Sequence, residues 1–338
     1  MRERGIDLAV VSPRASRGRD TFAAAGLPMV DIELGRGWHT VRALRRELRR
    51  GRYDILHVFS GRALQNGLLA SVGLPVRIVA YRGIVGNVSF ADPVSWLRFL
   101  NPRIARIICV ADAVRDFFLR MRPAFLRVPE ERLVTIHKGH SLDWYREPAA
   151  DLASAGIPPD AFVVGCVANY RPRKGIELLV DAVARLPESW NVHLLLVGDM
   201  EAARLAQAIE RSGAAARVHR TGYRPDAPAL AAACDVFVLP STRREGLARS
   251  LIEAMAYGVA PVVTDCGGSP ELVVDGVSGL IVPPGDAAAL AEAIAKLHED
   301  PQLRLRFGAA ARERIARDFR IEDTIERTID VYREVVAE

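Results

Sequence analysis

Two glutamates, Glu245 and Glu253, stand eight positions apart in the segment REGLARSLIEAMAYG. Glu245 belongs to a polar loop behind the apolar run DVFVLP, whereas Glu253 lies inside an apolar helical pattern that begins near Ser250. The amides of Ser250, Leu251 and Ile252 are then unsatisfied donors at the positive end of a helix, a place that suits a phosphate group. Both carboxylates can reach one elongated ligand whose phosphates lie between them, and a nucleotide sugar has that shape.

The same residues also fit an interpretation that involves no ligand. Ser250 and Glu253 have the spacing of a capping box, in which the Glu253 side chain accepts a hydrogen bond from the Ser250 amide and contributes about 1 kcal/mol. Glu245 fits an ordinary loop glutamate. The next turn, DCGGSPEL, favours a ligand, because Gly267 and Gly268 carry no side chain that would keep the backbone away from it.

The elements that must position these residues alternate regularly along the chain. Short β-branched runs alternate with helical patterns, and the runs are IDLAVV, DILHVF, VRIVAY and RIICV in the first half and FVVGCVA, VHLLLVG, DVFVLP and APVVT in the second. This alternation predicts βαβ units and parallel sheets in both halves. In such sheets, ligands bind outside the carboxyl ends of the strands.

The chain is 338 residues long, which suits two domains of common size. The stretch from 137 to 160 interrupts the alternation with polar residues, Pro and Gly, and we place the domain linker there. We therefore expect an N-terminal domain over 1–140, a C-terminal domain over 141–318, and a last helix over 319–338 that packs back towards the N-terminal domain.

Charge is distributed unevenly between the two halves. Residues 1–140 hold 24 Lys and Arg against 12 Asp and Glu, and the remainder has a net negative charge. The segment TVRALRRELRR predicts a helix with one basic and one apolar face: Arg42, Arg45, Arg46 and Arg49 against Val41, Leu44 and Leu48. Such a helix fits an anionic membrane surface, and it fits equally a solvated helix that covers a sheet.

Composition excludes several other classes of protein. No apolar run reaches the roughly 20 residues of a membrane span, and the N-terminus does not read as a signal peptide, so we expect a cytoplasmic location. The four cysteines lie singly in or beside apolar segments without metal-ligand spacing, which predicts reduced core thiols. The basic residues have no accompanying recognition module, so no nucleic-acid partner is expected.

Several segments of the second half follow one another in a specific order: RPRKGIELLVDAV, VHLLLVGD, RTGYRPDAPALAAACDVFVLPS and EGLARSLIEAMAYGVAPVVTDCGGSPELVVDGVSGLIVPPGD. In this order the chain resembles the retaining glycosyltransferases of the two-lobed GT-B type, namely glycosyltransferase family 4, often called group 1. The resemblance runs over nearly the whole chain and is strongest in the second half. It implies two Rossmann-like, doubly wound domains that face each other across a cleft, with no cofactor and no metal.

The resemblance also implies roles for the residues of the opening segment. Glu245 is expected to contact the donor sugar as the catalytic residue, and Glu253 to bind the nucleotide ribose hydroxyls. The other expected donor-binding residues of this region are Gly246, Ser250, Leu251, Gly267 and Gly268.

A basic pair usually clamps the donor diphosphate in this family, and Lys174 matches its lysine. The position of its arginine falls on Asn169, so Arg171 or Arg173 must take that place, because an asparagine supplies no charge. All three basic residues also fit a solvated loop. Tyr223 falls where relatives line the pocket for the nucleotide base, and a plain turn tyrosine is equally consistent.

The first half departs from the family pattern at two points. Relatives open with a strand and a glycine-rich turn that this chain lacks, so we expect an N-terminal domain without its first strand and regard a misplaced start as one explanation. In VAYRGIVGN, Arg82 stands where many relatives have a histidine near the reacting sugar. Arg82 can bind a phosphate or a sugar hydroxyl but does not readily exchange a proton, and a salt-bridging arginine fits as well.

The expected function is transfer of a sugar from a nucleotide diphosphate to an acceptor hydroxyl with retention of configuration. The basic first half favours a lipid-linked or other envelope glycan acceptor, such as a lipopolysaccharide precursor, reached at the inner face of the membrane. Two alternatives stay open: a catalytically impaired nucleotide-sugar-binding protein, and another GT-B enzyme such as a sugar-nucleotide epimerase.

Overall fold

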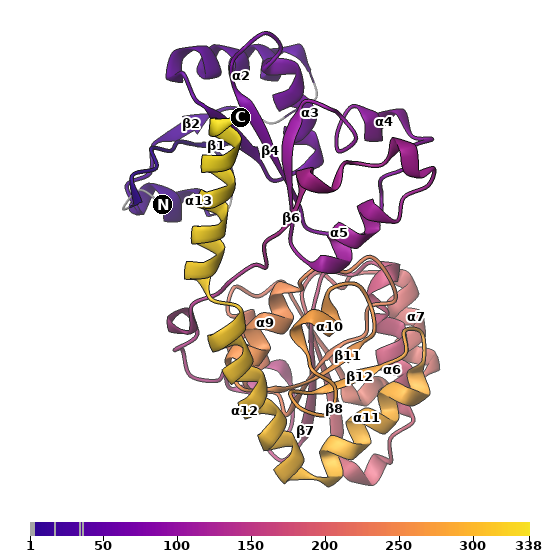
Figure 1. Cartoon of the computed structure of the whole chain (residues 1–338). Helices are drawn as coiled ribbons and strands as arrows, with labels where there is room; N and C mark the ends of the chain where they lie inside the picture. Colours follow the sequence, from indigo (N-terminus) through magenta and orange to yellow (C-terminus); the bar gives the residue numbers. More distant parts are fainter. Residues whose placement is uncertain (1–3, 17, 34, 36) are drawn as a thin grey trace.

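The computed structural model describes residues 4–338 except 17, 34 and 36. Two α/β domains lie one above the other in Figure 1, and both are built on parallel sheets, as the alternating pattern predicts. The last helix of the chain, α13 (Ile321–Ala337), leaves the C-terminal domain and runs alongside the N-terminal one.

The C-terminal domain contains a six-stranded parallel sheet in the order β12-β11-β10-β7-β8-β9. Its strands are β7 (Phe162–Val167), β8 (Val192–Val197), β9 (Val218–Gly222), β10 (Val236–Leu239), β11 (Ala260–Thr264) and β12 (Leu280–Val282). Its helices are α6 (Ile176–Ala184), α7 (Ala203–Arg211), α8 (Ala227–Ala232), α9 (Arg249–Ala256), α10 (Ser269–Leu272), α11 (Ala287–Glu299) and α12 (Pro301–Asp318).

Helices cover both faces of this sheet, because alternate residues of each strand point in opposite directions. Val164 and Val238 pack in one core with residues of α6 and α11. Phe237 and Leu239 pack in another core with residues of α9 and α12. The central strands are therefore buried on both sides, which explains their continuous apolar runs.

The N-terminal domain contains two separate sheets among the described residues. A four-stranded parallel sheet has the order β3-β4-β5-β6, and β1 and β2 form a parallel pair of their own. Its strands are β1 (Val10–Ser12), β2 (Met29–Asp31), β3 (Ile55–Val58), β4 (Arg77–Arg82), β5 (Ile104–Cys109) and β6 (Leu133–Thr135). Its helices are α1 (Arg19–Ala24), α2 (Trp38–Gly51), α3 (Gly61–Ala70), α4 (Pro93–Trp96) and α5 (Asp112–Leu119). The two sheets separate between the second and third strands of the domain.

Helix α13 covers one face of the four-stranded sheet, and α3 lies on the other. Val79 and Ile108 of the sheet pack against Val331 and Val335 of α13. Tyr332 of the same helix makes a 2.6 Å hydrogen bond to Nδ1 of His57, so His57 is a packed strand residue. The N-terminal domain therefore contains the last part of the chain.

The two chain segments that connect the domains are bonded to each other. The His140 amide donates to the Phe319 carbonyl at 2.8 Å, and the Gly139 amide donates to Thr324 Oγ1 at 2.7 Å. Thr324 Oγ1 donates in turn to the His137 carbonyl at 2.8 Å. These bonds place both connections on one side of the molecule.

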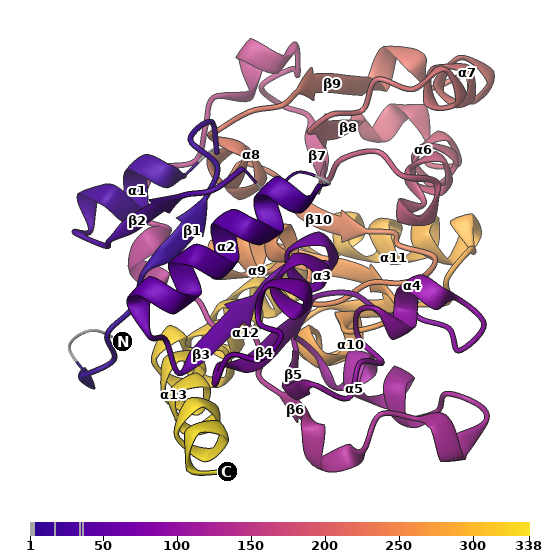
Figure 2. The ribbon, with the colours of Figure 1, turned by 90° about the horizontal axis from the view of Figure 1, so that it is seen from above.

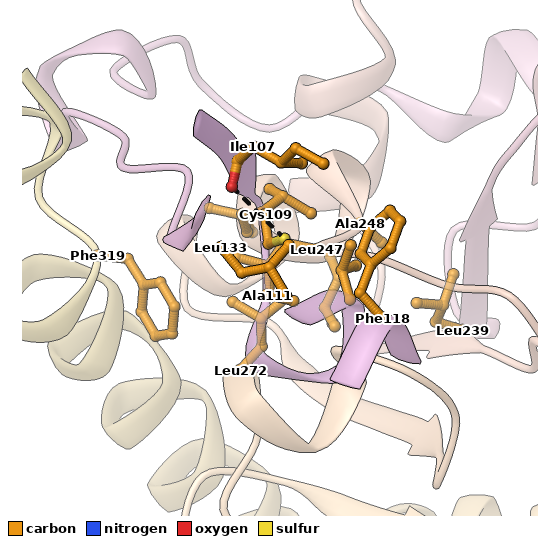
Figure 3. Packing of buried hydrophobic residues seen from close by; sticks show 14 of the residues in the cluster. Ile107, Cys109, Ala111, Phe118, Leu133, Leu239, Leu247, Ala248, Leu272 and Phe319 are labelled. Carbon is orange, nitrogen blue, oxygen red and sulfur yellow. Dashed lines mark hydrogen bonds between the residues drawn. The ribbon is translucent and has the colours of Figure 1, made fainter. Parts of the chain in front are cut away.

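A single apolar core continues from one domain to the other. Figure 3 shows Ala111 and Phe118 of the N-terminal domain in the same cluster as Leu247, Ala248 and Leu272 of the C-terminal domain. Burial of apolar area contributes roughly 25 cal/mol per Å², so this contact favours the closed arrangement of the domains.

Helix α2 has the predicted apolar face, with Val41, Leu44 and Leu48 buried. Its basic face differs from the prediction at one position. Arg45 is partly buried and donates to the Ala70 and Val72 carbonyls at the end of α3. The other predicted arginines, Arg42, Arg46 and Arg49, are exposed.

Two further properties of the sequence can be compared with the structure. Among the described residues, no helix is both long enough and apolar enough to cross a membrane. The four cysteines are buried and unpaired, as predicted, and burial raises the pKa of Cys109 and Cys166 to about 12.

Candidate active site

The candidate site lies where the strand order of the C-terminal sheet changes direction. The chain runs from β7 through β8 to β9 at one edge, returns to β10 beside β7, and then runs through β11 to β12 at the other edge. The loops that follow β7 and β10 therefore part in opposite directions at the carboxyl ends of these strands. In open α/β sheets this is where ligands bind.

Lys174 and Glu245 meet at this point. Lys174 follows β7, Glu245 follows β10, and Nζ of Lys174 lies 2.8 Å from Oε2 of Glu245. Ser241 Oγ also donates to Oε2, at 2.6 Å. Because the Lys174 and Glu245 side chains are largely buried, the Lys174 charge and the Ser241 hydrogen bond together stabilise a carboxylate that would otherwise be costly to remove from water.

Gly175 permits this meeting of the two loops. Its φ is +65°, and a Cβ atom at this position would lie 2.1 Å from the Pro240 carbonyl oxygen. Only glycine combines the left-handed conformation with so close an approach of backbone. The backbone next to Lys174 is thereby held against the loop that carries Glu245.

Helix α9 begins two residues earlier than the capping box requires. Its first helical residue is Arg249, its N-cap is Ala248, and no side chain caps it. Glu253 does not reach back to Ser250, and its Oε1 accepts from Nε of Arg249 at 2.6 Å. The capping-box interpretation is therefore wrong for Glu253, which is buried and paired with an exposed arginine one turn earlier.

The free amide donors at the start of α9 also differ from those that we predicted. The Leu251 and Ile252 amides both bond to the Ala248 carbonyl, at 3.1 and 3.2 Å, and the Leu251 side chain lies wholly in the core. The amides of Arg249 and Ser250 precede the first intrahelical bonds, so they are the donors that a helix end leaves without an intrahelical partner. The predicted anion site at this helix accordingly moves to these two amides.

Gly246, Gly267 and Gly268, which we predicted as donor-binding residues, allow neighbouring backbone segments to approach closely. A Cβ at Gly246 would lie 2.1 Å from the Gly83 carbonyl oxygen of the N-terminal domain. A Cβ at Gly267 would lie 2.1 Å from the Glu245 carbonyl oxygen, and one at Gly268 would lie 2.7 Å from that of Gly246. These glycines therefore pack the Glu245 loop between the DCGGSPEL turn and the N-terminal domain.

The Arg82 side chain points into the N-terminal domain, to which it belongs. Its side chain is buried, donates from Nε to the Ile84 carbonyl at 3.0 Å, and also bonds to the Gly86 carbonyl. Its guanidinium lies over the Phe99 ring, and burial lowers its pKa to about 10. Arg82 thus shapes the turn after β4, and this turn contacts the Glu245 loop at Gly83. The salt bridge that we predicted as an alternative role for Arg82 does not occur among the described residues, and its contact with a ligand stays a prediction.

The remaining basic residues predicted near the diphosphate lie in the loop after β7. Arg173 donates to the Arg244 carbonyl at 3.2 Å, and its own carbonyl accepts from the Thr242 amide at 2.8 Å. Arg171 is exposed and donates to the Tyr170 carbonyl. Arg173 is therefore bonded to the loop that carries Glu245, whereas the Arg171 side chain bonds within the loop after β7. Asn169 accepts from the Asp199 amide.

Tyr223 follows β9 and is 62% exposed. A large, mostly exposed aromatic ring is a side chain that can stack with a planar ligand. The structure thus places Tyr223 at the same edge of the sheet as Lys174 and Glu245, two strands away from β7.

Sequence reasoning missed the contribution of the domain linker. Lys138 and His140 belong to the linker, and Tyr145 Oη is hydrogen-bonded to Nδ1 of His140. Burial, followed by the charge of Arg249, lowers the pKa of Lys138, whereas Glu253 acts in the opposite direction. The linker thus brings a cation close to Glu253. The signals in the sequence were the unusual polarity of the stretch from 137 to 160 and the resemblance of HKGHSLDWY to the interdomain segment of the family, and neither predicts a contact with Glu253.

Sequence reasoning also missed two hollows on the other side of the Glu245 loop. They have volumes of about 580 and 430 Å³ and share Val85 and Phe117 in their walls. The larger one reaches Arg244 and the smaller one reaches Gly267, so both open between the domains. The larger hollow is lined mostly by the irregular segment after β4, which has no periodic pattern to predict it, and the smaller one mostly by residues of α5 and the two residues that follow it.

Two family descriptions match the chain, one for each domain. Residues 149–314 match "Glycosyl transferases group 1", and residues 1–139 match "Glycosyl transferase 4-like domain". Together they cover both domains that the sheets define.

Curated relatives are similar to this chain over different lengths. The lipopolysaccharide core biosynthesis glycosyltransferase LpsE of Rhizobium meliloti is 35% identical over 57% of this chain, and the match spans 54% of the relative. The alpha-maltose-1-phosphate synthase of Mycobacterium tuberculosis is 30% identical over 89% of this chain and 78% of the relative.

Solved structures are similar over nearly the whole chain. A glycosyltransferase from Rickettsia africae has a TM-score of 0.84 at 17% identity and covers 99% of this chain and 92% of its own. HepE from Anabaena in complex with UDP has a TM-score of 0.79 at 25% identity, over 94% of this chain and 89% of its own. The fold is thus that of the GT-B glycosyltransferases, with two Rossmann-like domains, and the chain belongs to the group 1, family 4-like glycosyltransferases.

Proposed function

We propose that this protein transfers a sugar from a nucleotide-diphosphate donor to an acceptor hydroxyl with retention of the anomeric configuration. The meeting of Lys174 and Glu245 at the reversal of the C-terminal sheet carries the proposal. A cation from the loop after β7 and a carboxylate from the loop after β10 meet there, and the second loop leads directly into the start of α9. This set of groups suits a sugar diphosphate, because each part of such a ligand meets a group of matching chemistry.

Charge develops on the departing diphosphate during transfer. Lys174 and the amides of Arg249 and Ser250 would stabilise this charge, since fixed cations and helix amides act strongly in a site shielded from water. Binding of the diphosphate would compete with Glu245 for Lys174. The Glu245 carboxylate is then released to accept hydrogen bonds from the donor sugar hydroxyls, while Glu253 accepts from the ribose.

The proton of the acceptor hydroxyl needs a base. In this proposal the leaving phosphate accepts it on the face where the acceptor attacks, without a bound metal. The apolar contact between the domains supports this step, because it excludes water from the reacting centre.

The choice of donor to test first comes from a similar structure. The crystal structures of HepE contain UDP and UDP-glucose. We infer that UDP and UDP-glucose are the first ligands to test on this chain. Tyr223 is the proposed stacking partner of the nucleotide base.

The acceptor is proposed to be a lipid-linked or other envelope glycan, as in lipopolysaccharide assembly. LpsE supports this choice by its description, and α2 supports it by its charge, because Arg42, Arg46 and Arg49 form an exposed basic face. A peripheral position on the inner, anionic face of the membrane follows from this proposal.

The decisive experiment replaces Glu245 by Gln. We expect turnover with UDP-glucose and a membrane-lipid acceptor extract to fall by a factor of roughly a hundred or more, because a neutral amide accepts sugar hydroxyls less strongly. The affinity for UDP, measured by calorimetry, should change less than threefold. Glu292→Gln, which changes an exposed glutamate of α11, serves as the matched control. Full turnover by the Glu245 variant would remove this residue from the mechanism.

One observation favours a second candidate, a catalytically impaired nucleotide-sugar-binding protein. Arg82, which stands where many relatives have a histidine, is occupied by the carbonyls of its own turn. The same calorimetric and turnover measurements on the unmodified chain separate the two. Binding of UDP-glucose without release of UDP in the presence of any acceptor would support the binding protein.

A further inference from the structure

Glu271 of the C-terminal domain is bonded to the N-terminal domain through both of its carboxylate oxygens. Oε2 accepts from the Asp112 amide and Oε1 from the Ala113 amide, each at 2.8 Å. These two amides are in the first turn of α5, whose N-cap, Ala111, makes no side-chain cap. A residue 158 positions away in the sequence therefore caps this helix.

The His137 side chain completes the contact. Its Nε2 lies 2.8 Å from Oε2 of Glu271, and the His137 carbonyl accepts from Thr324 at the start of α13. The carboxylate thus joins α5, the domain linker and α10. Glu271 is about 19% exposed at its side chain, so water screens these bonds only in part.

Glu271 is held rigidly on its own side. Arg314 of α12 donates from its guanidinium to the Glu271 and Leu272 carbonyls, at 2.9 and 2.7 Å. Because α10 is fixed to α12 in this way, the position of the Glu271 carboxylate is set by the C-terminal domain. The cap therefore couples the position of the N-terminal domain to that of the C-terminal domain.

The same short segment contacts the Glu245 loop. Gly267 and Gly268, just before α10, pack against the carbonyls of Glu245 and Gly246, and Gly268 also faces Ala111, the residue before α5. The Glu245 loop, α10 and the start of α5 are thus in successive contact. A shift of α5 relative to α10 would change the position of the N-terminal domain over Glu245.

Asp112, His137 and Glu271 also place their ligand atoms within 4.8 Å of one another, which raises the question of a cation. Both Glu271 oxygens already face amide hydrogens at the positive end of a helix. A metal ion would have to displace these donors and would meet an unfavourable helix dipole. The geometry is that of a helix cap.

From these contacts we propose that Glu271 is a positioning residue that locks the N-terminal domain over the donor site by capping α5. The cap is a two-oxygen contact that a carboxylate makes and an amide does not, because an amide offers one acceptor oxygen and an NH2 group to two N–H donors. The orientation of the domains therefore depends on this one side chain. Its effect on turnover rests on the proposed transferase activity, whereas its effect on structure does not.

Two variants test the cap from opposite sides. Glu271→Gln removes the second acceptor. Asp112→Pro removes one donor amide, and α5 tolerates it, because proline is favoured at the first position of a helix and Ala111 before it is extended. Asp112→Ala is the matched control, since it changes the same side chain and keeps the amide.

The first measurements need no substrate. In hydrogen exchange, the amide of Ala113 should exchange at least tenfold faster in Glu271→Gln and in Asp112→Pro than in the unmodified chain, while amides of β8 keep their rates. Small-angle scattering should show a larger radius of gyration for both variants. Asp112→Ala should match the unmodified chain in both measurements.

The activity measurement separates positioning from loss of stability. We expect Glu271→Gln to lower kcat by a factor of ten or more while the KM for donor and the affinity for UDP stay within twofold, because the donor residues lie in the C-terminal domain. The double variant with Asp112→Pro should be no worse than either single one. Unchanged exchange at Ala113 and an unchanged radius of gyration in Glu271→Gln would overturn the inference, whatever the activity of the protein.

Discussion

At the scale of single residues, the candidate site is characterised by charges that are already paired. Lys174 is bonded to Glu245, and Glu253 is bonded to Arg249. A ligand that binds here must exchange one partner for another, so its net affinity comes from the difference between two similar contacts. This favours a doubly charged ligand, which offers Lys174 more than the single carboxylate does.

His140 gives a prediction at this scale. Burial, with smaller contributions from Lys138 and Arg249, lowers its pKa to about 4. Because the unfolded chain has a histidine pKa near 6.5, the unfolded state binds the proton more strongly, and stability falls as pH decreases from about 6.5 towards 4. The contribution of this one group amounts to about 3 kcal/mol.

The test is to replace His140 by Asn, whose amide does not titrate and offers both a donor and an acceptor for the hydrogen bond with Tyr145. The midpoint of urea unfolding should decrease less between pH 7 and pH 5 in this variant than in the unmodified chain. His57 also has a pKa lowered to about 4 by burial, so the variant retains part of the dependence. Identical pH profiles for both proteins would contradict the assignment to His140.

At the scale of elements, the loops at the carboxyl edge of the C-terminal sheet are held by backbone contact. Gly175 and Gly267 both have a positive φ and both face a carbonyl oxygen of the Pro240–Gly246 loop. Close backbone contact therefore sets the spacing of these loops together with the side-chain bonds from Lys174 and Arg173. The position of Glu245 depends on the absence of Cβ atoms around it.

Replacing Gly175 by Ala should move Lys174 away from Glu245. We expect a loss of stability above the 1–2 kcal/mol that a left-handed alanine costs by itself, because its Cβ would also overlap the Pro240 carbonyl. Gly213→Ala is the matched control, since Gly213 has a φ of +73° and nothing within 4 Å of its added Cβ.

Thermal unfolding of the two variants gives the comparison. The melting temperature should fall further for Gly175→Ala than for Gly213→Ala, and only the former should lose affinity for UDP. Equal decreases in both proteins would mean that the overlap with Pro240 relaxes at no cost.

The sequence predicted the buried elements well and the exposed edges poorly. The continuous apolar runs of β7, β8, β10 and β11 identify central strands, because burial on both faces requires them. Strands β2, β6, β9 and β12 were missed, since they are three to five residues long and have no continuous buried run. The run predicted as a strand at 6–11 also shifted, to Val10–Ser12.

Contacts between side chains that are far apart along the chain also could not be predicted from the sequence. The segment with Glu245 and Glu253 was identifiable from spacing and order, but the bond from Lys174 to Glu245 joins residues 71 positions apart. The start of α9 was predicted to within one residue. The capping box requires Ser250 as the N-cap, two residues after the observed N-cap Ala248. This shift decided between a capping box and a pair with Arg249, because side-chain direction on a helix changes by about 100° per position.

At the scale of the whole molecule, charge separates the domains. The N-terminal domain carries the exposed arginines of α2, and the acidic residues are in excess in the remainder of the chain. An anionic surface would therefore attract one end of the molecule and orient the other end away from it.

Vesicle sedimentation tests this proposal. The unmodified chain should bind vesicles that contain phosphatidylglycerol at low salt and dissociate at 0.5 M salt, because screening shortens the reach of surface charges. Replacing Arg42, Arg46 and Arg49 by Gln should weaken binding on the order of a hundredfold, at about 1 kcal/mol per arginine.

A control with the same change in net charge replaces Arg185, Arg211 and Arg306 of the C-terminal domain, which are also exposed. This triple variant should bind vesicles nearly as well as the unmodified chain. Equal weakening by both triple variants would mean that total charge, and not the face of α2, determines binding.

The position of α13 has a consequence for how the protein is made. The N-terminal domain needs Val331, Tyr332 and Val335 to cover one face of its sheet, and these residues leave the ribosome after the whole C-terminal sheet. All strands of the C-terminal domain emerge before them. We therefore expect the second domain to complete its fold first during synthesis, while the first domain waits with an open hydrophobic face, the reverse of the usual order from the N-terminus.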